Sequence, residues 1–462
     1  MTNLPISILD QVNPPQAMPR TAGWPLVGSL PAFLRDPFPY LEQARAEHGD
    51  IFKLNLGLTD VVVCAHPDHV QHILRDNAQN YHKAGPLWNM VRTLLGNGLV
   101  VSEGEVWRRQ RRLMQPSFHR QHLTGLTDTM VTAIDEVLAS WAVAGSRPQP
   151  FDLMTGFSQV TMRVIMHTMF GTGMSTREMD DVGEAMSFIL DYMIGAIVTD
   201  ALPGWLPLPG KRRFRQALAR FDEVVYRIIE ESRQVEEPQN HLLAMLMNAV
   251  DAETGEGMST KQLRDEVATI FLAGYETTSI SLAWATHILA EQPDIQAKVQ
   301  AEVEACLGDR QPTFADLPRL AYTRMVIQEA MRVRPPVWFL PRAAANDDEI
   351  GGYAIPAGSQ VMSMNYLVHH HPHFWPEPHV FNPERFSPEQ ETRQHRFAWV
   401  PFGAGQRMCV GRDFALMESQ LALAMLVQRF EIAAAPGASP ILKPSTTLRT
   451  RQPLKVMMRP RC

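Results

Sequence analysis

A single cysteine in a glycine-rich turn is the strongest sign of chemistry in this sequence. The turn runs from Phe402 to Gly411 as FGAGQRMCVG and stands directly before the helical pattern of residues 412–430. The start of a helix offers backbone N–H donors and a positive dipole end, which together stabilise a thiolate. The glycines allow the backbone to pass close to a flat, bulky partner, and Arg407 would meet an anionic group on that partner. The pattern therefore predicts that Cys409 is a thiolate ligand.

Two other interpretations of this turn have to be weighed. A lone cysteine is more often an inert, buried side chain than a reactive one. The spacing Gly403-x-Gly405 also begins like a dinucleotide-binding loop, but Met408 stands where the third glycine is required. We therefore reject the dinucleotide loop. The interpretation of Cys409 as an inert cysteine can be rejected only if other segments of the chain carry residues that belong to the same kind of site.

A second group of residues lies at the centre of a long helical pattern, residues 261–291. The segment from Ala273 to Thr278 reads AGYETT. Glycine and paired threonines are poor choices for the middle of a helix, and a threonine hydroxyl can bond back to the preceding turn. A tolerated local weakness is one explanation. The departure from local propensity is, however, more typical of a working site, with Glu276 and Thr277 as its polar groups.

Charged residues recur at three further places. Glu329 and Arg332 are three residues apart on a helical pattern and, taken alone, predict a surface ion pair worth roughly 0.2–0.5 kcal/mol. Arg385 follows in the segment PERF, residues 383–386. Earlier, Trp107 and Arg111 belong to the basic run WRRQRR, residues 107–112, which by itself is typical of a solvated face or of a patch for an acidic partner.

These segments, in their order along the chain, resemble the signatures of the cytochrome P-450 family. The turn matches the family's haem-binding signature at five positions, Phe402, Gly405, Arg407, Cys409 and Gly411. The resemblance implies that Cys409 is the proximal ligand of a haem b, that Arg407 pairs with a haem propionate and that Phe402 packs beside the sulfur. A thiolate in this position favours cleavage of dioxygen. The resemblance covers nearly the whole chain from about residue 20 onward.

The resemblance also assigns the other segments. Glu276 and Thr277 would be the acid–alcohol pair that relays protons, and Ala273 of the same motif would lie against the haem. The structural network behind the haem would consist of Glu329, Arg332 and Arg385. The propionates would also be faced by Trp107, Arg111 and, from the segment after Pro341, Arg342. The remaining arginines of the basic run, Arg108, Arg109 and Arg112, would be candidates for docking an electron donor.

A run of histidines, His369-His370-His371-Pro372-His373, suggests a metal site at first sight. Adjacent histidines on an extended chain point in alternate directions, however, and cannot readily converge on one ion. The surroundings also resemble the ordinary family segment between the sheet and the cysteine turn. We therefore expect a structural role for this run.

The elements that must position these residues are mostly helical. Helical spacing marks residues 127–141, 159–170, 214–233, 261–291 and 412–430, whereas short strand patterns occur at 51–56, 61–64, 350–357, 360–364 and 454–458. We expect a mainly α protein with a minor β-sheet region, the cytochrome P-450 fold. Residues 1–20 would form an extended N-terminal arm, and residues 21–462 one large domain.

The composition agrees with a cytoplasmic enzyme. The net charge of −6 gives no reason to expect nucleic acid as a partner, and the four scattered cysteines suit a reducing compartment. The first 20 residues lack the basic and apolar regions of a signal peptide, and the most apolar stretch, residues 186–198, contains Asp191 and is too short to span a bilayer. We expect a soluble protein without a transmembrane anchor.

The substrate pocket follows only from the resemblance. Its walls would come from residues 85–101, 271–278 and 337–340, with residues 186–209 as a mobile lid. The residues expected to line it are largely apolar: Leu87, Trp88, Val91, Phe271, Val337, Trp338 and Phe339. They favour a lipophilic small molecule such as a fatty acid, a terpenoid or a polyketide.

The function that these inferences predict is monooxygenation. The enzyme would use dioxygen and two electrons to hydroxylate or epoxidise its substrate. Because only about 50 residues follow Cys409, electrons would come from NAD(P)H through a separate reductase and a ferredoxin or flavodoxin. Glu276 and Thr277 argue against a peroxide-using or isomerising relative and against the main alternative, a non-catalytic haem sensor or carrier. A zinc or nicotinamide enzyme would need converging histidines or a complete glycine loop.

Overall fold

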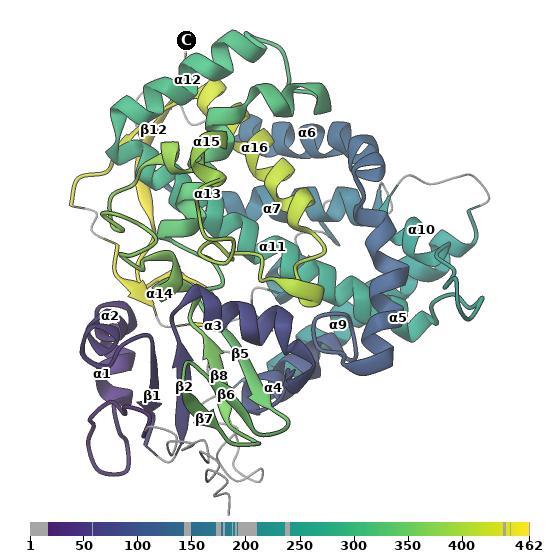
Figure 1. The fold of residues 1–462 in the computed structure, drawn as a ribbon. Helices are drawn as coiled ribbons and strands as arrows, with labels where there is room; N and C mark the ends of the chain where they lie inside the picture. Colours follow the sequence, from purple (N-terminus) through teal and green to yellow (C-terminus); the bar gives the residue numbers. More distant parts are fainter. Residues whose placement is uncertain are drawn as a thin grey trace, which may run out of the picture.

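The computed structural model describes residues 17–57, 59–142, 149–171, 177–178, 181–186, 188–189, 192, 210–235, 241–437, 440–443 and 445–461. In this part of the chain, helices form one side of the molecule and the larger sheet forms the other (Figure 1). The long helices are α6 (Arg120–Ala142), α7 (Leu153–Phe170), α9 (Lys211–Arg233), α11 (Thr260–Glu291), α12 (Pro293–Leu307), α13 (Ala321–Val333) and α16 (Arg412–Arg429). The shorter ones are α1 (Leu30–Arg35), α2 (Pro37–His48), α3 (Pro67–Gln71), α4 (Pro86–Leu95), α5 (Gly104–Met114), α10 (Leu242–Met247), α14 (Asn365–His369) and α15 (Pro388–Glu391).

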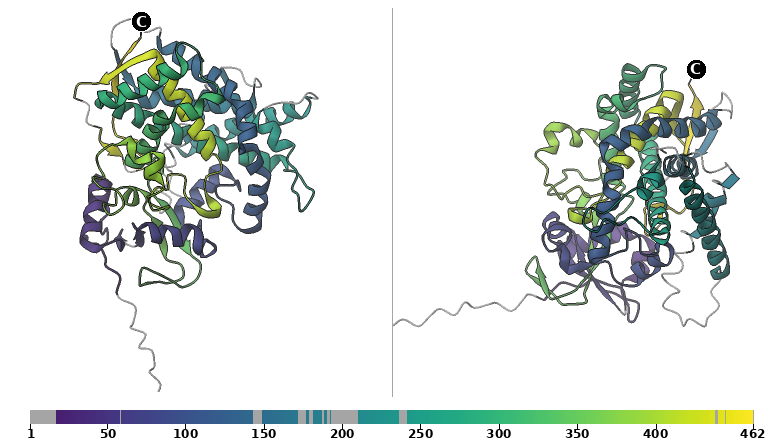
Figure 2. Two further views of the ribbon diagram at one scale, coloured as in Figure 1. Left: turned by 45° about the horizontal axis from the view of Figure 1, so that its top comes forward. Right: turned by 90° about the vertical axis from the view of Figure 1, so that its right-hand side faces the viewer.

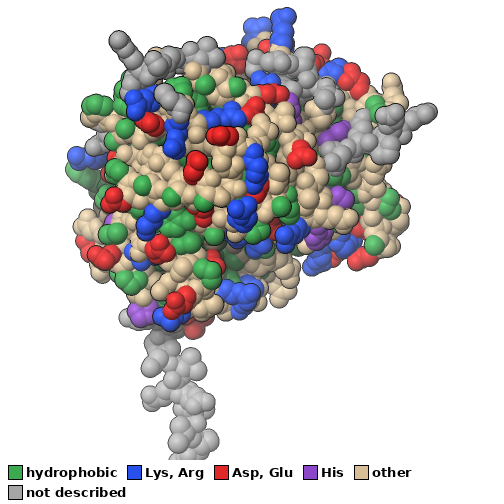
Figure 3. Space-filling model, turned by 90° about the horizontal axis from the view of Figure 1, so that it is seen from above, with side chains coloured by type: hydrophobic (Ala, Val, Ile, Leu, Met, Phe, Trp, Pro, Cys, Tyr) green, Lys and Arg blue, Asp and Glu red, His purple; other side chains and the backbone are tan. Residues whose placement is uncertain are grey.

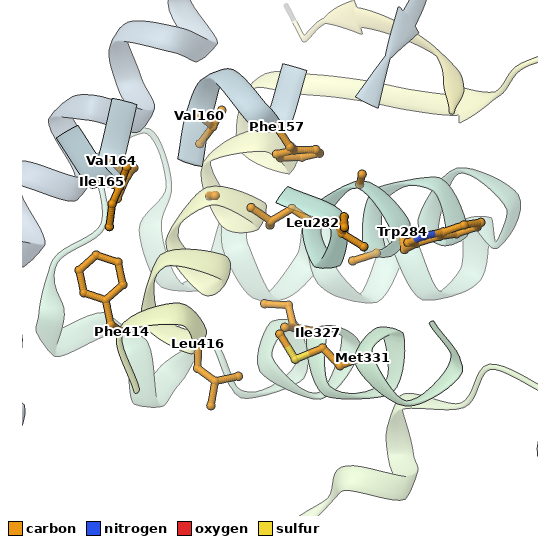
Figure 4. Close-up of a cluster of buried hydrophobic side chains, with 14 of the residues drawn as sticks. Phe157, Val160, Val164, Ile165, Leu282, Trp284, Ile327, Met331, Phe414 and Leu416 are labelled. Carbon is orange, nitrogen blue, oxygen red and sulfur yellow. The ribbon is translucent and has the colours of Figure 1, made fainter. Parts of the chain in front are cut away.

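Helix α11 is the central element of the helical side. It is buried along most of its length because α7, α9, α13 and α16 all pack against it. Figure 4 shows this core, in which Phe157 and Val160 of α7, Leu282 and Trp284 of α11, and Ile327 and Met331 of α13 approach one another. A helix covered on several sides needs apolar residues all round, which is why the hydrophobic pattern of residues 261–291 is not confined to one stripe.

The larger sheet combines strands from distant parts of the chain. Its order is β1 (Ile51–Asn55), β2 (Asp60–Cys64), β8 (Gln360–Ser363), β5 (Leu340–Ala344) and β3 (Tyr81–His82). All neighbours are antiparallel except β2 and β8. A second sheet joins β4 (Gln149–Asp152), β12 (Lys455–Pro460) and β9 (Phe430–Ala434). Two small hairpins complete the set, β6 (Asp348–Ile350) with β7 (Tyr353–Ile355) and β10 (Leu442–Lys443) with β11 (Arg449–Thr450).

The expected class, mainly helical with a minor sheet, is confirmed. The view in Figure 2 that is turned about the vertical axis shows the larger sheet at one end of the helical body and the yellow C-terminal strand β12 at the other. On the face drawn in Figure 3, acidic and basic side chains are interspersed. None of the helices in the described ranges combines the length and the apolar character that crossing a bilayer requires.

Two local expectations were wrong. Residues 350–357 do not form one strand, because the two glycines at 351 and 352 adopt positive φ angles (59° and 83°) and turn the chain into the β6–β7 hairpin. The histidine run is not extended either, because it starts at the last residue of α14. Of the expected arm, residues 1–16 lie outside the described residues. Arg20 forms an isolated backbone β-bridge with Lys53 of β1. Most of the expected lid, residues 186–209, also lies outside them.

A buried ion pair connects α13 to the chain that leads to the cysteine turn. Arg332 donates two hydrogen bonds to the carboxylate of Glu329, at 2.7 and 2.8 Å, and neither side chain is exposed at all. The same guanidinium donates to the carbonyl oxygens of His369 and Pro378. Arg385 lies 3.4 Å from Glu329 through its Nε, in a poorer orientation than Arg332. The three residues therefore form one network, and the expectation of a surface pair from spacing alone was wrong.

Replacing Glu329 with alanine should lower the free energy of unfolding by about 3–5 kcal/mol, because Arg332 would remain buried without its counter-charge. Urea denaturation followed by circular dichroism measures this loss. Glu389→Ala is the matched control, because Glu389 pairs with Arg393 on the surface and both side chains are largely exposed. Equal stability of the two variants would contradict a dependence of the fold on the buried pair.

Candidate active site

Cys409 lies three residues before Arg412, the first residue of α16. Its backbone N–H donates to the carbonyl oxygen of Phe402 at 2.9 Å, which closes the turn into a compact loop. Gly403 and Gly405 both have positive φ angles (68° and 65°), which L side chains rarely adopt. A Cβ on Gly405 would also lie only 2.0 Å from the carbonyl oxygen of Leu74. Both glycines thus serve the loop's own backbone, and Gly405 also serves its packing on residues 74–75. The expectation that the glycines make room for a flat partner stays a prediction.

The surroundings of the Cys409 thiol act on it in opposite directions. The residue is exposed, but the protein around its side chain raises the pKa of the thiol above its ordinary value by desolvation. The backbone N–H of Gly411 and the guanidinium groups of Arg111 and Arg412 act the other way and favour the thiolate. Arg111 also donates to the carbonyl oxygen of Met408 at 2.8 Å. A cationic partner in front of the sulfur, such as a metal ion, would complete the stabilisation of the thiolate.

Beside the loop, three basic side chains share one carboxylate. Arg407 lies 3.2 Å from Glu103, donates to the carbonyl oxygen of Ser102 and stacks on the ring of Trp107, with 4.3 Å between the guanidinium carbon and the ring centroid. Burial, and next the charge of Arg407, lowers the pKa of Arg342 to about 10. Burial, and next the charges of Arg342 and Arg407, lower the pKa of Lys83.

This cation cluster, defined as Lys83, Arg342 and Arg407, fits an anionic group. Two of its members lie near Trp88, with Lys83 Nζ 5.1 Å and the Arg342 guanidinium carbon 6.0 Å from the ring centroid. Arg407 Nη1 is buried and has no hydrogen-bond partner among the described residues. Buried positive charge in excess of negative charge is costly unless an anion completes the site. Lys83 carried no sequence signal, because only the tertiary fold brings residue 83 to Arg342 and Arg407.

The centre of α11 has one face that is open. Ala273 is exposed and Thr277 is half-buried, although residues 263–271 and 278–290 of this helix are buried. Thr277 Oγ1 donates to the carbonyl oxygen of Ala273 at 2.6 Å, and Thr161 of α7 donates to the carbonyl oxygen of Tyr275 at 2.9 Å. These hydroxyl groups give the carbonyls of Ala273 and Tyr275 additional hydrogen bonds. Helix α11 therefore stays continuous although this segment has a poor helix propensity.

Glu276 belongs to a different face of the same turn. Its side chain is buried, and its Oε1 accepts hydrogen bonds from Thr447 Oγ1 at 2.8 Å and from Arg449 Nε at 2.5 Å. Both partners belong to the C-terminal segment, more than 170 residues away in sequence. Sequence reasoning missed them, since neither residue stands in a recognisable motif.

Each buried histidine of the run has a separate partner. His369 Nε2 accepts from the backbone N–H of Val400 at 2.9 Å, His370 donates to the carbonyl oxygen of Tyr366 at 2.8 Å, and His371 lies 3.1 Å from Asp50. Burial, with a further contribution from the charge of Arg332, lowers the pKa of His369 to about 3, which keeps the ring neutral. These histidines thus bind the sheet and the cysteine turn together.

Three of the expected pocket residues have other surroundings. Trp338 is buried against Phe33 and Phe38 and donates to the carbonyl oxygen of Ser445. Phe271 packs edge-on against Phe221 of α9. Trp88 lies at the cation cluster and donates to the carbonyl oxygen of Pro341. These contacts do not support them as substrate contacts. The remaining four expected residues are half-buried: Leu87, Val91, Val337 and Phe339.

Comparison with known proteins identifies the family. Residues 18–458 match the family model "Cytochrome P-450". Cyclooctatin synthase of Streptomyces melanosporofaciens is 35% identical over 95% of this chain and 95% of its own length. Cyclooctat-9-en-7-ol 5-monooxygenase of the same organism is 34% identical over 90% and 89% of the two chains. Pentalenene oxygenase of Streptomyces avermitilis is 29% identical over 94% and 95%.

A solved structure gives the same answer for the fold. The haem domain of cytochrome P450DA superposes with a TM-score of 0.86 at 26% identity and covers 96% of this chain and 97% of its own. Members of this family carry a haem, act on lipophilic substrates and receive electrons from a redox partner. The exposed thiol of Cys409, the adjacent cation cluster and the open face of α11 fit such a group. The chain belongs to the cytochrome P-450 family and is a haem-dependent monooxygenase.

Proposed function

We propose that this enzyme hydroxylates or epoxidises a terpenoid. The observation that carries the proposal is the pairing of an exposed thiol before α16 with the cation cluster beside it, in a chain whose relatives oxidise such skeletons. The names of two relatives specify cyclooctat-9-en-7-ol and pentalenene, both unsaturated carbon skeletons with little polarity. The half-buried apolar side chains of Leu87, Val91, Val337 and Phe339 suit the same kind of molecule.

In this proposal Cys409 binds the haem iron, and the cation cluster of Lys83, Arg342 and Arg407 binds the propionates. The haem supplies the activation of dioxygen. The unpartnered Nη1 of Arg407 gives the cluster a free donor for a carboxylate oxygen. Trp107, whose ring stacks on Arg407, keeps that guanidinium in place, and Arg111 steadies the cysteine loop through Met408. Glu329, Arg332 and Arg385 act only through the fold.

Thr277 and Glu276 relay protons in this proposal. Thr277 lies on the open face of α11 one turn after Ala273, so its hydroxyl can exchange the bond to the Ala273 carbonyl for one to a bound molecule. Glu276 is the partner of Thr277 in the relay, because it is the acidic residue of α11 that is nearest to Thr277 in sequence. A positioned acid of this kind accelerates proton transfer by about 100-fold or more.

Electrons come, in this proposal, from a ferredoxin or flavodoxin that an NAD(P)H-dependent reductase reduces. The three arginines suggested for docking this donor already have local partners. Arg108 pairs with Glu105, Arg112 pairs with Asp251, and Arg109 donates to the carbonyl oxygen of Gly257. These arginines are therefore weaker candidates for docking the electron donor than the sequence alone suggested. The class of the donor, a ferredoxin or flavodoxin, stays part of the proposal.

Replacing Cys409 with serine should abolish the carbon monoxide difference spectrum that is typical of a thiolate-ligated haem, because a hydroxyl group does not replace the thiolate. The spectrum of the reduced, purified protein measures this. Cys306→Ser is the control, because Cys306 of α12 is buried and lies beside the Asp316 carboxylate. This variant should leave the spectrum unchanged. An unchanged spectrum in the Cys409 variant would remove the central assignment.

Replacing Thr277 with alanine should leave the haem bound but divert reduced oxygen to hydrogen peroxide, because the relay loses its hydroxyl group. We expect the yield of product per oxygen consumed to fall by about tenfold. Ser281→Ala is the matched control, because its hydroxyl donates to the Thr277 carbonyl at 2.9 Å one turn further along α11. Wild-type coupling in the Thr277 variant would rule out the relay.

The substrate class can be tested by spectral titration. Cyclic terpenoids and terpenoid alcohols should shift the haem spectrum in the manner of a substrate at micromolar concentrations, with fatty acids and polyketide macrolides binding at least about tenfold more weakly. A tighter response to fatty acids or macrolides would contradict the terpenoid assignment while leaving the monooxygenase family unaffected.

A further inference from the structure

The loop between α4 and α5 lies directly on α11. This crossing loop, residues 96–103, begins with the sequence GNGL. A Cβ on Gly98 would lie 2.1 Å from Thr269 Oγ1 and 2.6 Å from the carbonyl oxygen of Asp265, so the absence of a side chain allows the close approach. The loop therefore crosses α11 near Asp265, about two turns before the open face at Ala273.

Two neighbouring acids of α11 bind the backbone of the crossing loop. Asp265 Oδ2 accepts from the N–H of Asn97 at 3.0 Å, and Glu266 Oε2 accepts from the N–H of Leu99 at 2.8 Å. Both acids are buried. Asp265 also pairs with Lys261 at 2.8 Å, whereas no cation of the described residues lies within 4 Å of the Glu266 carboxyl group. Glu266 is thus a buried acid without a counter-charge beside it.

The hydrogen bond of Glu266 goes to the crossing loop and not to its own helix. Its Oε1 is buried and has no partner among the described residues. Burial raises the pKa of Glu266 to about 8, although the N–H of Leu99 opposes this effect, so the side chain is mostly protonated at neutral pH. A buried carboxyl group with one bond is costly, and the next residues, Val267 and Ala268, are apolar. A role in the core alone does not account for an acid at this position.

The other part of the crossing loop carries the cation cluster. Lys83 Nζ donates to the carbonyl oxygen of Val100 at 2.6 Å, and Arg407 donates to the carbonyl oxygen of Ser102. Glu103, the last residue of the loop, accepts from the backbone N–H of Lys83 at 2.9 Å and lies 3.2 Å from Arg407. Val100 directly follows the residue that is bound to α11. A single peptide unit therefore separates the contact on α11 from the first contact with the cluster.

Gln110 of α5 ties the two parts of the crossing loop together. Its Nε2 donates to the carbonyl oxygen of Asn97 at 2.6 Å, and its Oε1 accepts from the hydroxyl group of Ser102. The side chain of Gln110 is itself buried. A displacement of Leu99 on α11 would therefore move Val100 and Ser102 as well, because the loop has little freedom to absorb it.

We propose that Glu266 is a positioning residue of the cation cluster and acts on it through the crossing loop. By holding Leu99 on α11, it fixes the carbonyl oxygens to which Lys83 and Arg407 donate. Cations that are held in place before a carboxylate arrives bind it more tightly, because they lose less freedom on binding. Glu266 does not contact the haem in this proposal. The inference rests on the proposed binding of the propionates by the cluster.

The main test compares haem with its dimethyl ester, in which both propionates are uncharged. Each is loaded into the protein, and its transfer to an excess of apomyoglobin is timed. The wild type should release the ester faster than haem, because the ester brings no charge to the cluster. Glu266→Leu should release haem about tenfold faster than the wild type, but the ester at the wild-type rate to within about twofold, because only the carboxylates use the cluster.

The conservative variant and a loop variant extend this test. Glu266→Gln should release haem within about twofold of the wild-type rate, because its amide oxygen can accept from the N–H of Leu99. Gly98→Ala leaves the acid unchanged, but its methyl group would collide with Thr269 and lift the loop from α11. It should give the same selective effect as Glu266→Leu, and it carries the test if Glu266→Leu fails to fold.

Val267→Ala is the matched control for a general loss of stability. Val267 is the next residue of α11, is fully buried and has no polar group that could bind the loop. Removal of its two methyl groups leaves a cavity in the core. This variant should change the release of haem and of the ester by the same factor.

The outcomes distinguish the inference from the proposed function on which it rests. Equal acceleration of haem and ester release in Glu266→Leu would identify a purely structural role and overturn the inference. Release of haem at the wild-type rate in both Glu266→Leu and Gly98→Ala would overturn it too. Lys83→Met tests the cluster itself and should accelerate the release of haem alone. If Lys83→Met accelerates both equally, the proposed binding of the propionates fails, and the inference fails with it.

Discussion

A sulfur that must be anionic in surroundings that disfavour anions is the constraint on which the rest of this site depends. Desolvation raises the pKa of the Cys409 thiol, whereas the N–H of Gly411 and the charges of Arg111 and Arg412 oppose this effect. Such partial compensation leaves the sulfur ready for a cationic partner. The surrounding elements keep this balance in place. The turn closes through Phe402, Gly405 lets it pack on residues 74–75, and Arg111 binds the Met408 carbonyl.

The same principle, with the sign of the charge reversed, explains the cation cluster. Lys83, Arg342 and Arg407 come from three separate parts of the chain and share Glu103, so positive charge exceeds negative charge in a buried region. The chain thus presents an unsatisfied anion site beside an unsatisfied cation site. A ligand that carries a metal ion at its centre and carboxylates at its edge would satisfy both.

Helix α11 combines two requirements that local propensity sets against each other. It has to cross the core as a continuous helix, and it has to present a small residue and a hydroxyl group at one open turn. The hydroxyl groups of Thr161, Thr277 and Ser279 bind the carbonyls of Tyr275, Ala273 and Glu276, and they compensate for the weak helix formers of this segment. The partners of the Glu276 carboxylate come instead from the C-terminal segment, so the two ends of the proposed relay are controlled by different parts of the fold.

The sequence by itself predicted the long helices and pointed to Cys409 as a ligand, because helical periodicity, glycine spacing and the order of the motifs are local properties. It placed α11 and α16 to within one residue at each end and identified the turn before Cys409. It could not determine which side chains meet across the fold. Spacing alone made Glu329 and Arg332 a surface pair, whereas packing buries them completely. Lys83 joins Arg342, and Arg449 reaches Glu276, only because sheets and hairpins bring distant residues together. Desolvation and long-range contacts decide such pairs, and neither is written in any short stretch of sequence.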